Sequence, residues 1–187
     1  MDLGIIKRDD TAFVLIDIQE KFLPVIYDIQ GVIDNANRLV QGASILNIPL
    51  LVTEQYPKGL GKTVEGISFV CLDRMKSQEI IEKIAFDCFG CDEFVNKINQ
   101  LNRKSLVIFG IEAHVCVLKT SLEALNRGYE VHLIADAVSS RTQRNRDIAI
   151  ERMRQSGAFI ASTEMILFQL MDQAGTDEFK AISKLVK

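Results

Sequence analysis

Short apolar runs rich in β-branched residues alternate along this sequence with longer amphipathic stretches, and this alternation constrains the fold more than any other feature. The short runs are apolar at consecutive positions, which is typical of strands covered on both faces. The longer stretches repeat apolar residues at three- and four-residue steps, as a helix with one buried face does. The sequence therefore predicts βαβ units around a doubly wound, mainly parallel, six-stranded sheet in a three-layer α/β/α arrangement.

The expected elements follow from these two patterns. Strands are predicted over residues 11–17, 48–53, 104–110, 129–136 and 158–161, with a short sixth strand near 82–86. Helices are predicted over residues 32–47, 91–102, 115–128 and 142–157, with a final helix in 176–187. Gly128 and Gly157 stand where helix C-termini favour glycine. Residues 54–66 are rich in glycine and polar side chains, so we expect a mobile loop over the site there.

The bulk properties narrow the class of protein. A length of 187 residues fits a single domain spanning residues 1–187. With 22 basic and 25 acidic side chains and no basic stripe, we expect no nucleic-acid partner. No apolar run approaches the ~20 residues of a membrane helix, and the N-terminus lacks the apolar segment of a secretory signal.

The cysteines indicate the compartment. Cys71, Cys88, Cys91 and Cys116 are few for a chain of this length, and no export signal accompanies them. We therefore expect reduced thiols rather than a disulfide framework. This predicts a cytoplasmic location, with the matrix of an organelle as the alternative.

Two polar side chains come directly after, or shortly after, predicted strands. Asp17 follows the apolar run 13–16, so it is expected at the carboxyl edge of the sheet, where open α/β folds bind ligands. The alternative is a structural helix cap, which is common for such acids. Cys116 lies in the first turn of the helix after strand 104–110, where the helix dipole favours a thiolate. An inert buried thiol is the alternative there.

Lys83 is the third candidate. It precedes apolar residues in the segment EKIAF. If the short strand near 82–86 lies beside Asp17, the ammonium is buried and needs a carboxylate partner. Without that placement, a solvent-exposed lysine is the simpler interpretation.

Four segments carry a resemblance to a known family: FVLIDIQEKF, EKIAFDCFG, GIEAHVCVLKTSLEAL and LIADAVSSR, in this order over roughly residues 10–170. This arrangement resembles the isochorismatase-like cysteine hydrolases, the superfamily that includes nicotinamidases and N-carbamoylsarcosine amidases. The segments TEQYPKGLG and IEKIAFDCFGC are similar to isochorismatase-domain proteins whose substrates are mostly undefined. The resemblance implies a Rossmann-like sheet of the isochorismatase-like hydrolase fold.

The resemblance also implies residue roles. Cys116 would be the nucleophile, Asp17 the general base and acid, and Lys83 the orienting cation, which together form a catalytic triad. A cis peptide bond would join Ile111 and Glu112, and the backbone N–H groups of Glu112 and Cys116 would form an oxyanion hole. The implied activity is hydrolysis of a small amide, ureide or ester through a covalent Cys116 intermediate. Among these bonds, the resemblance favours carbon–nitrogen bonds other than peptide bonds.

The sequence departs from two branches of this superfamily. Nicotinamidases bind a metal through Asp-x-His and further histidines after the second strand, whereas this chain has only His114 and His132. A three-histidine site cannot form, so we expect a metal-independent enzyme without a cofactor. His132 is expected to be a packed core residue. Isochorismatases proper cleave a vinyl ether and lack the nucleophilic cysteine, so the family name does not define the reaction.

Side chains from several loops are expected to select the small-molecule substrate. These pocket candidates are Gln19, Tyr56, Leu60, Phe86, Phe89, Ser139 and Arg141. Since relatives with this fold assemble through exposed helix faces, we also expect a homo-oligomer, from dimer to octamer.

Two alternatives belong to other classes of protein. Cys88 and Cys91 form a Cys-x-x-Cys pair between a possible strand and a helix, which is the local context of a thiol-disulfide oxidoreductase. Thioredoxin-like folds place a cis-proline beside that motif from a downstream strand, however, and Pro24, Pro49 and Pro57 all lie upstream. The other alternative is a non-catalytic oligomeric scaffold.

Overall fold

The computed structural model describes residues 3–67 and 80–187, so Cys71 and the other residues of 68–79 lie outside the described part of the chain. Its centre is a six-stranded sheet in which all neighbouring strands are parallel. The strands are β1 (Thr11–Ile16), β2 (Leu50–Gln55), β3 (Ile81–Lys83), β4 (Ser105–Ile111), β5 (Glu130–Ser139) and β6 (Phe159–Ala161). The predicted parallel sheet is confirmed.

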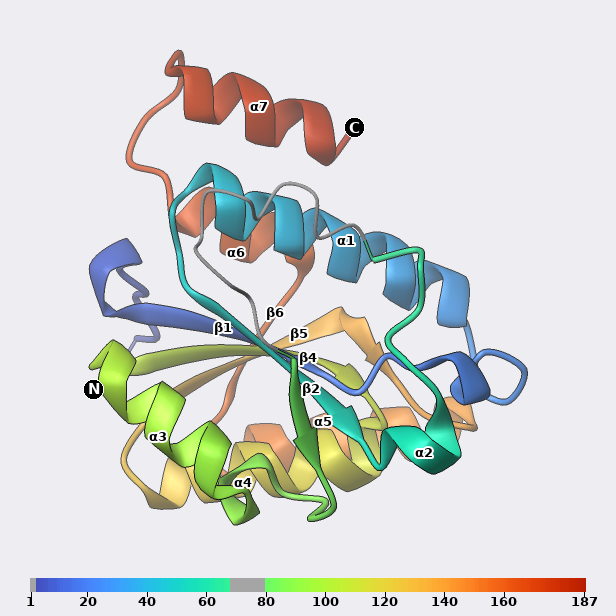
Figure 1. The fold of residues 1–187 in the computed structure, drawn as a ribbon. Coiled ribbons are helices and arrows are strands. Elements are labelled where there is room, and N and C mark those ends of the chain that lie inside the picture. The colour runs from blue at the N-terminus through green and yellow to red at the C-terminus, as the bar shows by residue number, and fades with distance from the viewer. Residues whose placement is uncertain (1–2, 68–79) are drawn as a thin grey trace.

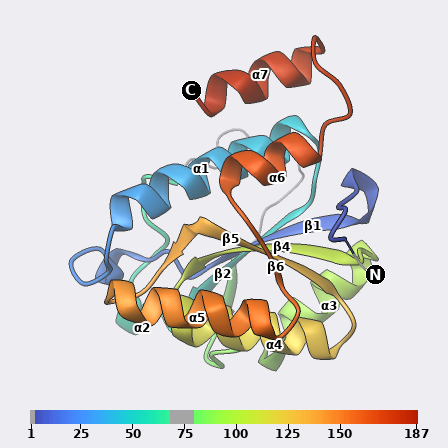
Figure 2. The same ribbon diagram turned by 180° about the vertical axis from the view of Figure 1, so that it is seen from behind.

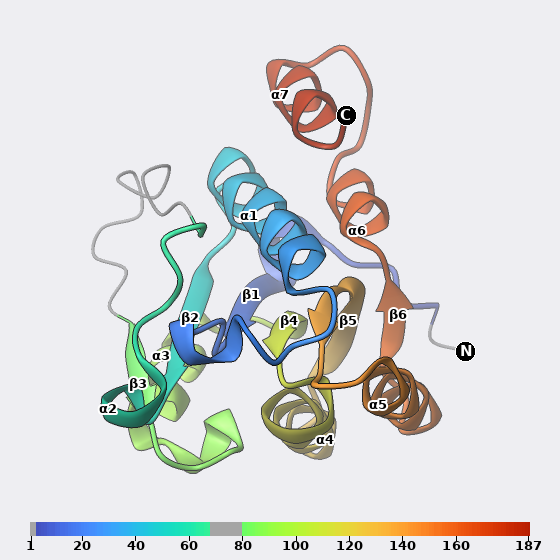
Figure 3. The same cartoon turned by 90° about the vertical axis from the view of Figure 1, so that its right-hand side faces the viewer.

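Helices cover both faces of this sheet (Figure 1, Figure 3). On one face lie α1 (Ile29–Ile45) and α6 (Thr163–Gln169), with α7 (Asp177–Leu185) outside them. On the other face lie α3 (Asp92–Leu101), α4 (Leu118–Asn126) and α5 (Gln143–Gln155). Seen from behind, α5 and α6 lie on opposite sides of the sheet and are joined through β6 (Figure 2). The three-layer α/β/α architecture is therefore confirmed.

None of the helices in the described part of the chain is long and apolar enough to cross a membrane.

The central strands explain why their sequences are apolar at every position. All residues of β1 and β4 are buried, because helices cover both faces of the sheet at this point. The rings of Phe13 and Phe109 meet edge to face, with their centroids 6.2 Å apart. Burial on both faces removes the alternation of polar and apolar residues that a one-sided sheet would show.

The strand order is β3-β2-β1-β4-β5-β6, so successive strands are added on one side of β1 up to β3 and on its other side from β4 onward. The chain moves from β1 to β2 on one side and later starts β4 on the other side. Open α/β sheets bind ligands outside the carboxyl ends of the strands at such a switch point. The topology therefore places the segments after β1 and after β4, with Asp17 and Cys116, at the expected position for a site.

Gly110 allows β1 and β4 to approach closely just before this point. It has a φ of 122° and pairs with Ile16, and a Cβ atom on it would lie 2.1 Å from the Ile16 carbonyl oxygen. Only glycine fits both the backbone angle and the space. The strand pairing with β5 also shifts register between Ile108 and Gly110.

The structure corrects the loop predicted over residues 54–66. β2 continues to Gln55, and the short helix α2 (Pro57–Leu60) follows it. The end of the segment is held by hydrogen bonds: the Glu54 carboxylate accepts from the Thr63 N–H at 2.6 Å and from the Thr63 hydroxyl at 2.8 Å. The predicted loop is therefore corrected: residues 54 and 55 belong to β2, residues 57–60 form α2, and Glu54 holds Thr63 by hydrogen bonds.

Other boundaries differ by a few residues. β5 extends to Ser139, beyond its predicted end, and the helix predicted from residue 115 begins with a π-helical turn over Ala113–Val117. The seven-residue helix α6 was not predicted; it is short and is capped by Ser162, whose hydroxyl accepts from the Met165 N–H. Gly128 and Gly157 follow α4 and α5 with positive φ angles of 85° and 105°, as predicted.

Candidate active site

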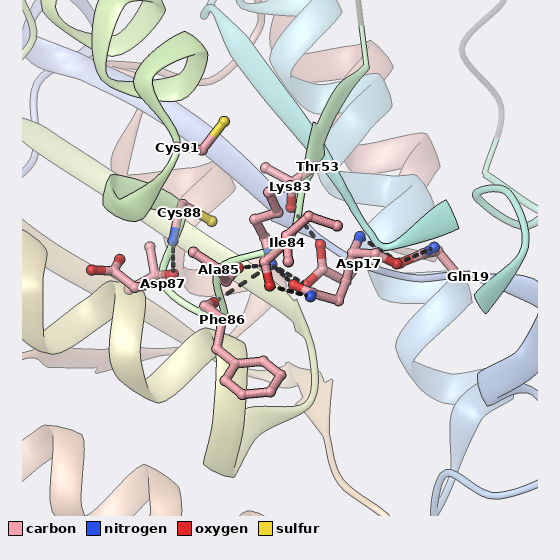
Figure 4. A network of polar contacts seen from close by, with 12 residues as sticks. Asp17, Gln19, Thr53, Lys83, Ile84, Ala85, Phe86, Asp87, Cys88 and Cys91 are labelled. Carbon is pink, nitrogen blue, oxygen red and sulfur yellow. Dashed lines mark hydrogen bonds and ion pairs between the residues drawn. The ribbon is translucent and has the colours of Figure 1, made fainter. Parts of the chain in front are cut away.

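A buried ion pair joins the ends of β1 and β3 (Figure 4). The Lys83 Nζ atom lies 2.7 Å from Asp17 Oδ2, and the two side chains are 0% and 1% exposed. Asp17 directly follows β1 and has a φ of 55°, a left-handed conformation that turns the chain out of the sheet. A buried ammonium requires a carboxylate partner, and the structure provides one.

β2 lies between these two strands and contributes two side chains that the sequence analysis missed. The Thr53 hydroxyl donates to Asp17 Oδ1 at 2.7 Å, and Gln55 Oε1 accepts from Lys83 Nζ at 2.7 Å. Alternate residues of a strand point to the same face, which brings both side chains to the ion pair. The signal in the sequence was a run of polar residues at the end of an apolar strand.

The Lys83 ammonium remains charged in this environment. Burial lowers its pKa, but the Asp17 carboxylate, together with the Cys88 and Cys116 thiols, raises it more. The net pKa lies above the ordinary lysine value. Lys83 is therefore a cation at neutral pH.

Cys116 lies in the π-helical turn before α4 and is 6% exposed. Burial raises the pKa of its thiol, the Asp17 carboxylate raises it further, and Lys83 lowers it. The Asp17 carboxylate therefore favours the protonated form of the thiol. The lowered pKa predicted from the position at a helix start is not found: the pKa of the thiol is raised, with burial as the largest cause and the Asp17 carboxylate next.

The turn that holds Cys116 is anchored on Glu112. The peptide bond between Ile111 and Glu112 is cis. The Glu112 carbonyl oxygen accepts from the N–H groups of Val115 at 3.0 Å and Val117 at 3.2 Å, on either side of Cys116. Backbone hydrogen bonds to one carbonyl therefore fix the position of the thiol relative to the end of β4.

The Glu112 carboxylate reaches the next loop of the sheet edge. It accepts from Arg141 Nε at 3.0 Å and from the Arg141 N–H at 3.3 Å. Arg141 Nη2 also lies 3.5 Å from His114 Nε2, while His114 Nδ1 lies 3.0 Å from the Ser140 hydroxyl. The guanidinium remains largely exposed, so it is available to a ligand.

Three of the predicted pocket residues have structural partners instead of an open surface. Gln19 is fully buried, and its amide bonds to Gln55 and Gly61. The ring of Phe89 packs against Phe94 and Tyr129. Ser139 is buried and donates to the Tyr27 carbonyl oxygen.

The other pocket candidates keep accessible surface. Tyr56 is 51% and Phe86 53% exposed, and Leu60 is half-buried. Phe86 lies close to the ion pair, since its carbonyl oxygen is 3.5 Å from Lys83 Nζ. Together with Arg141 these residues remain candidates for contact with substrate.

The Cys88 and Cys91 pair does not have the environment of a redox motif. Cys88 is fully buried, and burial raises its pKa to about 12. Cys91 is half-buried, and its Sγ lies 3.8 Å from the Glu82 carbonyl oxygen. Thiol-disulfide exchange starts from an accessible thiolate, which this arrangement disfavours at Cys88.

His132 is engaged away from the site. His132 is buried, bonds to the Glu130 carboxylate at 2.7 Å and stacks on the Phe159 ring, so its prediction as a core residue is confirmed. Within residues 3–67 and 80–187, no three or more histidine, cysteine or acidic side chains group together as metal ligands would.

Comparison with known sequences shows the family of this chain. The isochorismatase domain family matches residues 11–165. The secreted isochorismatase effector Isc1 of Phytophthora sojae is 42% identical over 186 residues, covering 99% of this chain and 88% of that protein. Isochorismatase domain-containing protein 2 of Danio rerio is 40% identical, covering 98% and 90%. The chain belongs to the isochorismatase family, whose members are hydrolases.

Solved structures agree with the fold. The structure of the MAR1 ribonuclease from Caenorhabditis elegans superimposes with a TM-score of 0.86 at 35% identity, covering 97% of this chain and 91% of that one. YcaC from Pseudomonas aeruginosa gives 0.90 at 22% identity, covering 99% and 93%. YcaC from Escherichia coli, described as an octameric hydrolase of unknown specificity, gives 0.83 at 23% identity, covering 91% and 83%.

Proposed function

We propose that this protein is a metal-independent cysteine hydrolase that cleaves a small amide, ureide or ester through a covalent intermediate on Cys116. The observation that carries the proposal is the position of Asp17. Its carboxylate binds the Lys83 ammonium at 2.7 Å, and both charges act on the nearby Cys116 thiol, whose pKa the carboxylate raises and the ammonium lowers. A base, a cation and a nucleophile thus share one buried site, as covalent catalysis requires.

The first half of the reaction forms the intermediate. Asp17 accepts the thiol proton while Cys116 Sγ attacks the carbonyl carbon of the substrate. The backbone N–H groups of Glu112 and Cys116 stabilise the negative charge that develops on the carbonyl oxygen. The C–N or C–O bond then breaks, and the leaving nitrogen or oxygen takes the proton from Asp17. The acyl or carbamoyl group remains on the sulfur.

The second half of the reaction releases the acyl or carbamoyl group from the sulfur. Asp17 accepts a proton from a water molecule, and the water oxygen attacks the carbonyl carbon of the intermediate. The C–S bond breaks, and the sulfur regains a proton from Asp17. Lys83 stays protonated throughout and keeps the Asp17 carboxylate oriented toward the sulfur.

The donor groups of the chain support a reaction without a metal. The whole chain has two histidines, of which His132 is packed in the core. At the end of β2, Gln55 binds Lys83 through its amide oxygen. An amide oxygen already engaged with an ammonium is a poor metal ligand, and we propose no cofactor.

Tyr56, Leu60, Phe86 and Arg141 are proposed to select the substrate. Their accessible side chains come from the segments after β2, β3 and β5, all at the carboxyl edge of the sheet, with Leu60 at the end of α2. Three of them are apolar or aromatic and one is a cation. A substrate with an apolar part and a polar or anionic end would match this set.

A screen of small amides, ureides and esters tests the proposal. We expect turnover in the wild type, none in Cys116→Ala and unchanged turnover in Cys91→Ala, together with a mass increase on the Cys116 peptide when the reaction is quenched. Since the similar protein from Caenorhabditis elegans is named a ribonuclease, RNA belongs in the screen. Turnover of any substrate that survives Cys116→Ala would contradict the proposed mechanism.

We also propose a homo-oligomer, from dimer to octamer. Large apolar side chains remain exposed on the helices α5 and α6: Ile148, Met165 and Phe168. Neighbouring exposed apolar side chains such as Met165 and Phe168, one turn apart on α6, can become buried in a subunit contact. Light scattering should give a mass of at least two chains, and the mass of one chain would overturn the proposal.

A cytoplasmic or organelle-matrix location completes the proposal. Among the described cysteines, Cys88, Cys91 and Cys116 are free thiols, which suits a reducing compartment. The Phytophthora sojae relative is named a secreted effector, so the compartment needs its own test. Recovery of the protein mainly from the medium of the source cells would contradict it.

A further inference from the structure

β1 leaves the sheet before β2 ends. The two strands pair as far as Ile16 and Thr53, after which the left-handed backbone of Asp17 turns the chain away. Without a neighbour on this side, the backbone groups of Gln55 would have no hydrogen-bond partners from β1. Buried backbone groups without partners destabilise the fold.

The side chain of Gln19 takes the place of the missing strand. Its Oε1 accepts from the Gln55 N–H at 2.8 Å, and its Nε2 donates to the Gln55 carbonyl oxygen at 3.0 Å. The same Nε2 donates to the Gly61 carbonyl oxygen at 2.7 Å. One buried amide therefore continues the hydrogen bonding of β1 along β2 and also holds the end of the α2 segment.

The side chain of Gln55 is fixed in turn and reaches the ion pair. Its Oε1 accepts from Lys83 Nζ at 2.7 Å, and its Nε2 donates to the Ile84 carbonyl oxygen at 2.7 Å. The other acceptors near Lys83 Nζ are the carbonyl oxygens of Ala85 at 3.4 Å and Phe86 at 3.5 Å. Gln55 and Asp17 are thus the two close acceptors that orient the ammonium.

We propose that Gln19 and Gln55 form a positioning pair for the reaction, in which Gln19 holds Gln55 and Gln55 holds Lys83 in place beside Asp17. Neither side chain touches the reacting atoms. The inference rests on the proposed function, because the pair acts on Cys116 only through Lys83. It also gives a reason for the burial of the Gln19 amide.

The positioning pair of Gln19 and Gln55 should affect the rate at which iodoacetamide alkylates Cys116. The charged and titratable groups that act on this thiol are Asp17 after β1, Lys83 on β3 and Cys88 after β3. Of these, only Lys83 stabilises the thiolate. An ammonium that has lost a close acceptor is held less firmly, so it should stabilise the thiolate less.

The experiment is a double-mutant cycle with Gln55→Met, Gln19→Met and both together, read as alkylation of the Cys116 peptide by mass spectrometry across a pH series. We expect Gln55→Met to slow alkylation about tenfold, the order of one lost hydrogen bond to a charged group, and to move its midpoint to higher pH. Gln19→Met should slow it as well. The double variant should be no slower than Gln55→Met, because Gln19 acts through Gln55. The control Gln155→Met changes an exposed residue of α5 and should react like the wild type.

Two results would overturn the proposal: an unchanged rate and midpoint in Gln55→Met, or losses that multiply in the double variant. If Gln55→Met does not fold, Gln55→Glu replaces it. The new carboxylate would offset the positive charge of Lys83, so the thiolate of Cys116 would be less stable and the pH midpoint of its alkylation would rise. An unchanged pH midpoint would again count against the positioning pair. If Cys116→Ala keeps the turnover of the wild type, the hydrolase mechanism fails. If turnover requires Cys116 but its alkylation does not respond to Gln55→Met, only the positioning pair fails.

Discussion

The Lys83 ammonium and the Asp17 carboxylate lie 2.7 Å apart with both side chains fully buried. Breaking such a pair from one side leaves a buried charge without a partner. Lys83→Met should therefore lower the free energy of unfolding by about 3 to 5 kcal/mol, measured by urea denaturation. The matched control Lys97→Met removes a lysine paired on the surface of α3 and should cost less than about 1 kcal/mol.

The double variant Asp17→Asn/Lys83→Met distinguishes two contributions to the loss of unfolding free energy: the lost ion pair and the buried Asp17 charge that Lys83→Met leaves without a partner. It should be more stable than Lys83→Met alone, because no uncompensated carboxylate remains. A Lys83→Met protein as stable as Lys97→Met would show that the pair does not exist in solution.

Thr53 should affect reactivity as well as stability. Thr53→Val keeps nearly the same shape but removes the hydroxyl that donates to Asp17 Oδ1. We expect a loss of about 1 to 3 kcal/mol in unfolding free energy and slower alkylation of Cys116, since the carboxylate loses an orienting donor. Thr11→Val removes a hydroxyl bond to the Lys7 carbonyl at the opposite end of β1 and should leave the alkylation unchanged. Equal alkylation rates in the two variants would argue against a role for Thr53 at the site.

The buried Cys88 thiol predicts a loss of stability in alkali. Burial raises its pKa from an ordinary 9.0 to about 12, so the stabilising contribution is complete below pH 9. Above that pH the unfolded chain loses the proton while the folded chain keeps it, so each pH unit should cost about 1.4 kcal/mol. Unfolding free energies measured from neutral pH into this range should fall less steeply in Cys88→Ala. Cys91→Ala should keep the wild-type slope, and equal slopes in all three proteins would refute the prediction.

Gly110 should tolerate no side chain. Gly110→Ala would place a Cβ atom 2.1 Å from the Ile16 carbonyl oxygen in addition to its positive φ, so we expect a loss on the order of 3 kcal/mol. Gly128→Ala has a similar backbone strain but no atom within 4 Å of the new Cβ, and it should cost about 1 kcal/mol. Thermal unfolding of the two variants checks the difference, and equal losses would mean that the contact between β1 and β4 is looser than the structure shows.

The sequence determined the architecture because its signals are local. Consecutive apolar residues marked the buried strands, and helical spacing marked most of the covering helices. Parallel strands all end at one edge of the sheet, so Asp17 and Cys116 could be assigned to that edge without coordinates. The short helix α6 and the anchored segment after Gln55 escaped, because a few residues carry too little periodicity to predict.

The tertiary structure decided how the site is assembled. Lys83 meets Asp17 because β2 pairs with both β1 and β3, so that the two residues lie at the same edge of the sheet on either side of β2. Strand order cannot be deduced from the composition of one short strand. Thr53 and Gln55 join the site through the same neighbour relationship, and Gln19 pairs with Gln55 only because Asp17 turns β1 out of the sheet. Even the direction of the Cys116 pKa followed from burial beside a carboxylate. Charge, burial and hydrogen bonding at this site depend on distances between segments far apart in the chain, which sequence spacing does not contain.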